Sequence, residues 1–249
     1  MYEEETKEQG VPLNETTSSD DLIVQPKVSS NKYFELYKDY IKPVLSPEEQ
    51  SKVYQGVKQE HERYIKKSEE LCDIVEERFA LADWKQLFSD DELGVYSWER
   101  VTDKGLKSTK IELQIEGQVF NLLKVLANDP KYRKLYDSSY HSSHFLQKVN
   151  DHIWINYTRC KKVSIVSGRD WVLIYNYKVT EEGIVYLTCY SDDREDLMPL
   201  QEDLVRAGMP IAAWKIHQLN DKIIQCSYLV EVDFKGNVPN FLMTQAFKD

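Results

Sequence analysis

The chain has 249 residues, a formal net charge of −10 at pH 7 and a sequence pI of about 5.1. This acidic balance excludes a nucleic-acid backbone as an expected partner, because phosphate binding needs a basic surface. No apolar run approaches the roughly 18 residues of a membrane-spanning helix, and the acidic N-terminus resembles neither a signal peptide nor an Arg-rich transit peptide. We therefore expect a cytoplasmic protein.

Two small basic clusters interrupt this acidic chain, at residues 131–134 and at Lys161–Lys162. An acidic chain is repelled by an anionic membrane surface unless its basic residues are segregated. Clusters of this size are ordinarily part of the solvated surface. We expect solvated surface here and leave a transient membrane contact open.

Signals of catalysis, metal binding or disulfide formation are weak. The four cysteines form no Cys-x-x-Cys pair, which favours a reducing compartment over a zinc or redox site. The sequence has neither a Gly-x-Ser-x-Gly motif nor a phosphate-binding Gly-rich loop. His141 and His144 lie three residues apart on an expected strand and so face opposite sides. We therefore expect no enzyme activity, no metal site and no cofactor.

Residues 1–45 are expected to form an acidic flexible tail and a short helix. Residues 1–30 are rich in Glu, Ser, Thr, Asn and Asp, a composition that buries too little surface to become ordered alone. They form a flexible tail, or an arm that orders on a partner. Residues 31–42 place aromatic side chains at helical spacing, and Pro43 ends that helix.

A long amphipathic helix is predicted from Ser46. Ser46 caps its start, Pro47 suits the first turn and Glu49 completes a capping box. Apolar residues then recur with a period near 3.6 as far as Phe79, and apart from Gly56 almost nothing breaks a helix before about Phe88, which predicts one long helix or two in sequence. We assign residues 46–78 to this helix as a separate segment, which either packs on its own domain or binds another protein.

From about residue 92 the apolar period changes to two, which predicts strands at 93–101 and 107–115. Helices follow at 117–128 and 132–138. Six consecutive strands then predict an antiparallel meander and an α+β fold. They lie at 141–149, 152–161, 170–179, 183–190, 205–218 and 223–234, before a last helix that starts near Val238–Pro239. A curved antiparallel sheet around a terminal helix has the right shape for an internal cavity.

Four motifs occur in order along these elements. They are Asp129-Pro-Lys-Tyr-Arg-Lys-Leu-Tyr-Asp137, Ser167-Gly-Arg-Asp-Trp-Val172, Val205-Arg206 followed by Ala213-Trp214, and Val232-Asp-Phe-Lys-Gly-Asn-Val-Pro-Asn-Phe-Leu242. Together they resemble the START (steroidogenic acute regulatory protein-related lipid transfer) domain family. The resemblance implies a helix-grip fold over residues 79–249, a bent antiparallel sheet closed by a C-terminal helix. It also implies non-catalytic binding and transfer of a sterol, phospholipid or sphingolipid in a buried tunnel.

Alternation along the strands predicts which side chains share a face. Aromatic walls with polar tips suit an amphipathic ligand, although which face is concave stays open. The candidate lipid-binding residues are Tyr157, Arg169, Trp171, Leu173, Tyr175, Tyr177, Tyr186, Tyr190, Trp214, Tyr228, Phe241 and Leu242.

Arg169 and Asp170 are the most prominent polar pair in the sequence. They form a structural ion pair at a strand end, or Arg169 meets a lipid headgroup or controls the opening of a loop. Residues 163–168 and the acidic segment 192–203 are expected as loops at the tunnel mouth.

The sequence departs from the family pattern at two positions. Many sterol-binding members carry an arginine where this chain has Tyr175, and Asn156 stands in place of the acidic partner of that arginine. These departures concern the charged pair that would meet a sterol hydroxyl.

Two functions are consistent with this sequence. The first is a lipid carrier that takes apolar tails into the tunnel and selects the lipid head with a few polar groups. The alternative is a START-like fold used as an interaction subunit of a larger assembly, with a protein partner bound through residues 1–75. A carrier is expected to be monomeric and to copurify with lipid.

Overall fold

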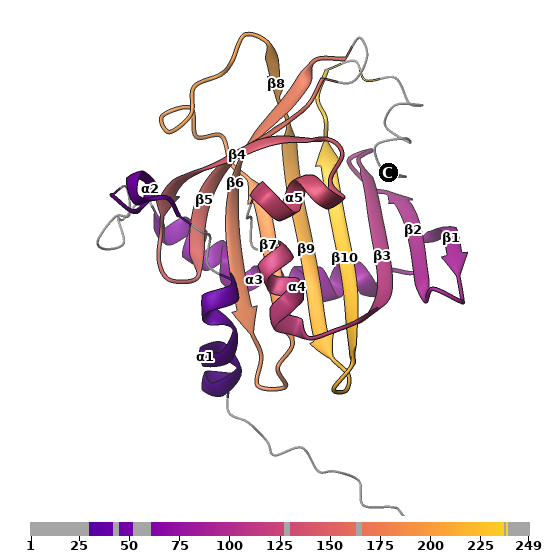
Figure 1. Cartoon of the computed structure of the whole chain (residues 1–249). Coiled ribbons are helices and arrows are strands. Elements are labelled where there is room, and N and C mark those ends of the chain that lie inside the picture. Colours follow the sequence, from indigo (N-terminus) through magenta and orange to yellow (C-terminus); the bar gives the residue numbers. More distant parts are fainter. Residues whose placement is uncertain are drawn as a thin grey trace, which may run out of the picture.

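The computed structural model describes residues 30–41, 45–51, 61–126, 130–162, 166–236 and 238. A curved sheet dominates this part of the chain (Figure 1), with the strand order β1-β2-β3-β10-β9-β7-β6-β5-β4 and with β8 beside β6. Neighbouring strands are antiparallel except for β8, which pairs parallel with β6. The strands are β1 (Lys85–Asp90), β2 (Val95–Val101), β3 (Lys107–Glu116), β4 (Tyr140–Lys148), β5 (Ile153–Cys160), β6 (Gly168–Val179), β7 (Val185–Ser191), β8 (Leu204–Arg206), β9 (Gly208–Gln218) and β10 (Ile223–Asp233).

The predicted α+β fold class and its antiparallel meander are confirmed. The strands from β4 to β7 follow one another in the sheet, and β9 and β10 continue it to β3. The expected strand ranges agree with the observed ones to within about two residues, except that the range 205–218 is divided between β8 and β9. The predicted C-terminal helix lies outside the described residues.

The described helices are α1 (Ser30–Ile41), α2 (Pro47–Ser51), α3 (Glu62–Ala80), α4 (Val119–Leu126) and α5 (Pro130–Tyr136). The predicted capping box at the start of α2 is present. The backbone N–H of Ser46 donates to Glu49 Oε2 over 2.8 Å, and the N–H of Glu49 donates to Ser46 Oγ over 3.2 Å. Residues 52–60 of the predicted long helix lie outside the described part of the chain.

The prediction that this helix continues to Phe88 is wrong, because α3 ends at Ala80 and a strand begins at Lys85. Leu81 has an extended backbone, and the indole of Trp84 turns back to donate to the carbonyl of Arg78 over 3.1 Å. The strand β1 then pairs with β2. Leu87 and Phe88 lie past Phe79, the last apolar position of the predicted period, and both are about half exposed on this edge strand.

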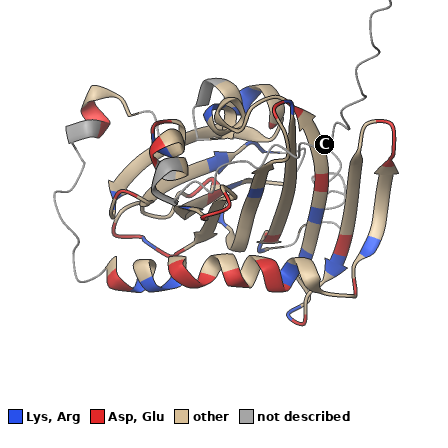
Figure 2. Cartoon of the chain, turned by 90° about the horizontal axis from the view of Figure 1, so that it is seen from below, with Lys and Arg blue, Asp and Glu red and all other residues tan. Residues whose placement is uncertain are grey.

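The helix α3 packs across one face of the sheet, called the outer face below. It buries Tyr64, Leu71, Cys72 and Val75. The strands contribute Ile153, Ile155, Tyr157, Val172, Ile174, Tyr186, Tyr190, Ile211, Ala213 and Leu229 to the same core. Figure 2 shows α3 along the edge of the molecule, with acidic and basic residues distributed over its length. The described part of the long helical segment therefore packs on its own domain.

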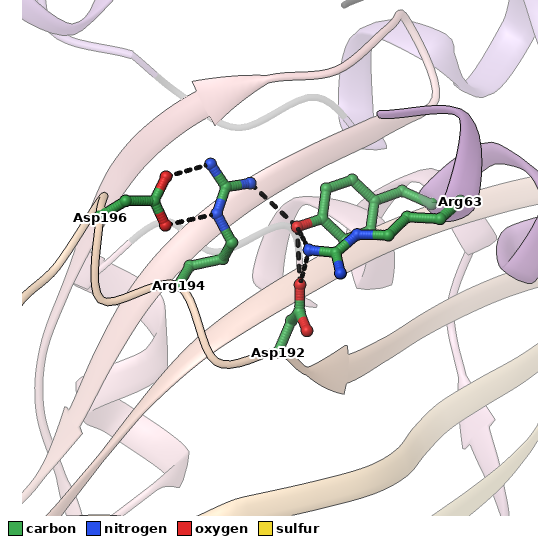
Figure 3. A network of polar contacts seen from close by, with 5 residues as sticks. Arg63, Asp192, Arg194 and Asp196 are labelled. Atoms are coloured by element: carbon green, nitrogen blue, oxygen red, sulfur yellow. Dashed lines mark hydrogen bonds and ion pairs between the residues drawn. The ribbon is translucent and has the colours of Figure 1, made fainter. Parts of the chain in front are cut away.

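A polar network fixes the start of α3 to the chain that follows β7 (Figure 3). Tyr64 donates its hydroxyl hydrogen to Asp192 over 2.6 Å, and Arg63 donates to the same carboxylate oxygen over 2.7 Å. Arg194 donates to the Tyr64 hydroxyl over 2.9 Å and forms an ion pair with Asp196. The first residues of segment 192–203, expected as a loop at the tunnel mouth, are therefore tied to α3 on the outer face.

Asp170 is the centre of a second, more deeply buried network. Its carboxylate accepts from Arg206 Nε over 3.0 Å, from Arg206 Nη2 over 3.1 Å and from the Tyr157 hydroxyl over 2.9 Å. The side chains of Asp170 and Arg206 are only 1% and 6% exposed. Asp170 therefore does not pair with its neighbour Arg169, because consecutive strand residues point to opposite faces.

Replacing Asp170 by Asn should lower the free energy of unfolding by about 3 kcal/mol, because it leaves the buried Arg206 without its counter-ion. Urea denaturation followed by circular dichroism measures this loss. The control is Asp203→Asn, since Asp203 pairs with Arg159 but is 76% exposed; a change within about 0.5 kcal/mol is expected there. A loss below about 1 kcal/mol for Asp170→Asn would contradict the assigned role.

Candidate functional site: the concave face of the sheet

The face of the sheet opposite α3 is concave, and α4 and α5 lie over it (Figure 1). At one end α4 packs Val119 and Leu123 against this face. At the other end the strands pack mainly on one another. The residues that β6, β7, β9 and β10 send to this face are Trp171, Leu173, Tyr175, Tyr177, Val185, Leu187, Cys189, Ala212, Trp214, Ile216, Ile224, Cys226, Tyr228, Val230 and Val232.

Six of the twelve predicted lipid-binding residues lie on the concave face: Trp171, Leu173, Tyr175, Tyr177, Trp214 and Tyr228. Three lie on the outer face in the core beneath α3, so we remove them from the candidate site: Tyr157, Tyr186 and Tyr190. The hydroxyls of Tyr157 and Tyr186 are used there by Asp170 and by Glu76 of α3. Phe241 and Leu242 lie outside the described residues.

Arg169, the remaining predicted residue, lies at the start of β6 and holds neighbouring backbone. Its guanidinium donates to the carbonyls of Phe234 and Lys235 over 3.2 and 3.0 Å, and to that of Ser167 over 2.5 Å. Burial lowers the pKa of this group. These contacts join β6 to the chain that leaves β10, which favours a structural role for Arg169 over headgroup binding.

Three large aromatic side chains keep accessible surface at the middle of the concave face. Tyr175, Trp214 and Tyr228 are half-buried, whereas the residues two positions before and after each of them, on the same face, are buried. Trp154 stacks on Tyr175 with ring centroids 5.5 Å apart, and Trp214 lies 4.5 Å from Tyr228. Burial raises the pKa of Tyr175 to about 12 and also raises that of Tyr228. Their hydroxyls are thus poorly hydrated, neutral hydrogen-bonding groups on an apolar wall.

Arg133 of α5 brings a positive charge to this wall. Its Nε donates to Asp137 Oδ2 over 3.2 Å, and its guanidinium lies 5.1 Å from the ring centre of Tyr140. A hydrogen bond links it to Tyr175 on β6. Burial alone would lower the pKa of Arg133, but Tyr175 and Asp137 outweigh burial and raise it. The guanidinium therefore stays charged beside an aromatic wall.

Sequence reasoning missed Arg133 as a site residue and assigned it to a solvated basic cluster. The signal that could have found it is the spacing of Arg133 and Asp137, which are four residues apart. On a helix this spacing places both side chains on one face. Because α5 lies over the concave face, that side of the helix faces the wall.

Several buried polar atoms on the concave side of β5 and β6 have no hydrogen-bond partner among the described residues. They include Trp154 Nε1, Asn156 Oδ1 and Trp171 Nε1. Asn156 lies opposite Leu173 in the β5–β6 ladder, and Trp154 lies opposite Tyr175. The two positions at which the sequence departs from the sterol-type pattern, Asn156 and Tyr175, are thus close neighbours on the wall. An unsatisfied buried polar atom costs about 1–3 kcal/mol, so this group of atoms indicates a place for a polar ligand atom.

The curved sheet, its concave aromatic wall and the helices over it have counterparts among known proteins. The START domain family profile matches residues 62–249. The chain belongs to the START domain family. This assignment confirms the family resemblance inferred from the four sequence motifs.

Solved START structures share the fold at low sequence identity. Human StAR-related lipid transfer protein 5 is 18% identical with a TM-score of 0.65, over 76% of this chain and 90% of that one. Human STARD10 is 20% identical with a TM-score of 0.60, over 77% and 74%. A STAR-related lipid transfer protein from Xanthomonas axonopodis is 20% identical with a TM-score of 0.54, over 66% and 90%. A search of curated protein sequences gave no match.

Two features are absent from the part of the chain that the structure describes. None of its helices has the length and apolar character needed to cross a membrane. Nor do three or more of its His, Cys, Asp and Glu side chains gather where they could hold a metal ion.

The thiol of Cys189 reports whether water reaches the concave face. Burial raises its pKa to about 12. At pH 8 the reactive thiolate is therefore about 1000-fold rarer than for a thiol with a pKa near 9. The thiolate becomes abundant only as the pH approaches 12. Iodoacetamide should therefore alkylate Cys189 at least 1000-fold more slowly in the folded chain than in urea. Time-resolved peptide mass mapping measures this, with the half-buried Cys160 as the faster internal control. Folded and unfolded rates within about tenfold of each other would mean that the wall is open to water.

Proposed function

We propose that this START domain binds one amphipathic lipid against the concave face of the sheet and transfers it between membranes. The observation that carries the proposal is a charged, hydrogen-bonding group of residues set in an apolar wall. Membership of the START family and the fold shared with proteins named for lipid transfer support it.

The apolar part of the wall suits acyl chains. Tyr175, Trp214 and Tyr228 offer aromatic surface that is not used up by protein packing, and Leu173 and Val230 flank them. Each methylene moved from water to such a surface gains roughly 0.8 kcal/mol. A chain of a dozen methylenes would thus supply most of the affinity without any specific contact.

The polar part of the wall suits a lipid head with several acceptor oxygens. Arg133 carries a planar set of donors that matches phosphate in a bidentate manner, and Trp171 adds an unused N–H. A sterol offers only one hydroxyl, which cannot serve Arg133, Trp171 and Asn156 together. We therefore propose a phospholipid as the preferred ligand, with its phosphate at Arg133.

Replacing Arg133 by Leu should weaken the binding of phosphatidylcholine roughly 30-fold, the effect of losing about 2 kcal/mol of charge-assisted hydrogen bonds. Titration followed by native mass spectrometry measures the one-to-one adduct. The matched control is Arg159→Leu, because Arg159 lies near the other end of β5 from Trp154 and pairs with Asp203. Arg133→Lys keeps the charge next to Asp137 but loses the bidentate fork, so an intermediate loss is expected.

Two results would count against this function. If Arg133→Leu binds phosphatidylcholine as tightly as the wild-type chain, the lipid head lies elsewhere. If the folded wild-type chain forms no adduct with any lipid of a total lipid extract, the carrier hypothesis fails. The alternative, an interaction subunit with a protein partner bound through residues 1–75, would then become the leading explanation.

A further inference from the structure

The two basic clusters of the sequence lie side by side in the fold. Lys161, directly after β5, donates its Nζ hydrogen to the carbonyl of Ser138 over 2.8 Å, and its backbone N–H donates to the carbonyl of Ser139 over 2.8 Å. Ser138 and Ser139 directly follow α5 and Asp137. Residues 25 or more positions apart thus form one surface, called the α5 patch and made of Lys134, Leu135, Tyr136, Lys161 and Lys162.

The α5 patch combines exposed apolar and basic side chains. Leu135 is 81% exposed, the highest value among the large apolar side chains of the described residues, and Tyr136 is 47% exposed. Lys134, Lys161 and Lys162 are also exposed, and none of them forms an ion pair within the described part of the chain. A single exposed leucine is ordinary. A leucine and a tyrosine among three uncompensated lysines are unusual in a chain with a net charge of −10.

The patch also lies directly behind the candidate site. Arg133 and Leu135 are two residues apart on α5, so their side chains point about 200° apart around the helix axis. Arg133 faces Tyr175 on the concave wall, and Leu135 faces outward. One short helix therefore carries Arg133 on the side of the site and Leu135 on the opposite side, with Tyr136 nearer to Arg133.

We propose that the α5 patch docks this domain on a lipid bilayer that contains anionic lipids. Leu135 enters the headgroup region, where an apolar side chain is favoured, and the partly exposed Tyr136 borders the contact on the side of the lipid site. Lys134, Lys161 and Lys162 contact the anionic headgroups, and the rest of the acidic surface stays away from the membrane. This inference rests on the proposed function, because it places the membrane next to the helix that lines the lipid site.

Charge complementarity sets the expected size of the effect. A lysine near an anionic membrane surface strengthens binding about fivefold. Loss of three lysines should therefore weaken binding to anionic vesicles roughly 100-fold, and raised salt should weaken the wild-type interaction in the same direction. Vesicles of phosphatidylcholine alone should bind the wild-type chain weakly.

Vesicle flotation tests the proposal with the full chain. The vesicles contain phosphatidylcholine alone or phosphatidylcholine with phosphatidylserine. One variant is Lys134→Gln/Lys161→Gln/Lys162→Gln, and a second is Leu135→Ser. The matched controls are Lys85→Gln/Lys104→Gln/Lys222→Gln and Leu93→Ser, all at exposed positions on other parts of the surface. Because every substituted side chain is exposed, folding should be unaffected, which thermal unfolding checks.

The proposal expects both patch variants to lose binding to phosphatidylserine vesicles while both controls keep it. Equal binding by patch variants and controls overturns it. Equal binding of the wild-type chain to vesicles with and without phosphatidylserine also overturns it. The patch would then be tested as a binding surface for an acidic protein.

A second measurement separates this inference from the proposed function. Uptake of a water-soluble short-chain phosphatidylcholine needs the lipid site but no bilayer, and native mass spectrometry detects it. Patch variants should take up this lipid as the wild-type chain does. If wild-type protein docks on vesicles through the patch but takes up no short-chain lipid, docking stands and the lipid-binding function fails.

Discussion

The packing of α3 on the sheet is the constraint on which the rest of the structure depends. Side chains alternate along a strand. When one residue contacts α3, its two neighbours along the strand therefore point to the opposite face. Val172 and Ile174 complete the core beneath α3, and this directs Trp171, Leu173 and Tyr175 to the concave wall. The packing of α3 on the outer face therefore determines which side chains form the concave wall, although α3 does not contact that wall.

Most of this fold could be predicted from the sequence because its signals are local. The sequence pattern predicted the strands from β2 to β10, with β8 and β9 as one strand, and the helices α4 and α5. The error at β1 has a physical reason: Leu87 and Phe88 lie on an edge strand that buries almost nothing, so no burial pattern distinguished a strand from the end of a helix. Residues 85–90 form a strand because they pair with β2, and β2 lies outside the stretch that the helix prediction covered.

The candidate site could be predicted only in part, because alternation says which residues share a face but not what covers that face. Tyr186 and Tyr175 have the same aromatic character and both lie on central strands, yet α3 covers only the first. The polar residues show the same limit. Asp170 pairs with Arg206, 36 residues further along the chain, and Arg133 reaches the wall from a helix whose position the sequence does not encode locally.

The position of α5 gives a physical reason for joining lipid binding to membrane contact. A lipid that leaves a bilayer must keep its tails out of water throughout, since each exposed methylene costs roughly 0.8 kcal/mol. A wall far from the membrane would expose the whole chain during transfer. Arg133 and Leu135 lie on opposite sides of the same seven-residue helix, so a bilayer at Leu135 is one helix diameter, about 10 Å, from the wall. Docking at Leu135, as proposed, would thus keep the distance that the lipid tails travel between bilayer and wall short.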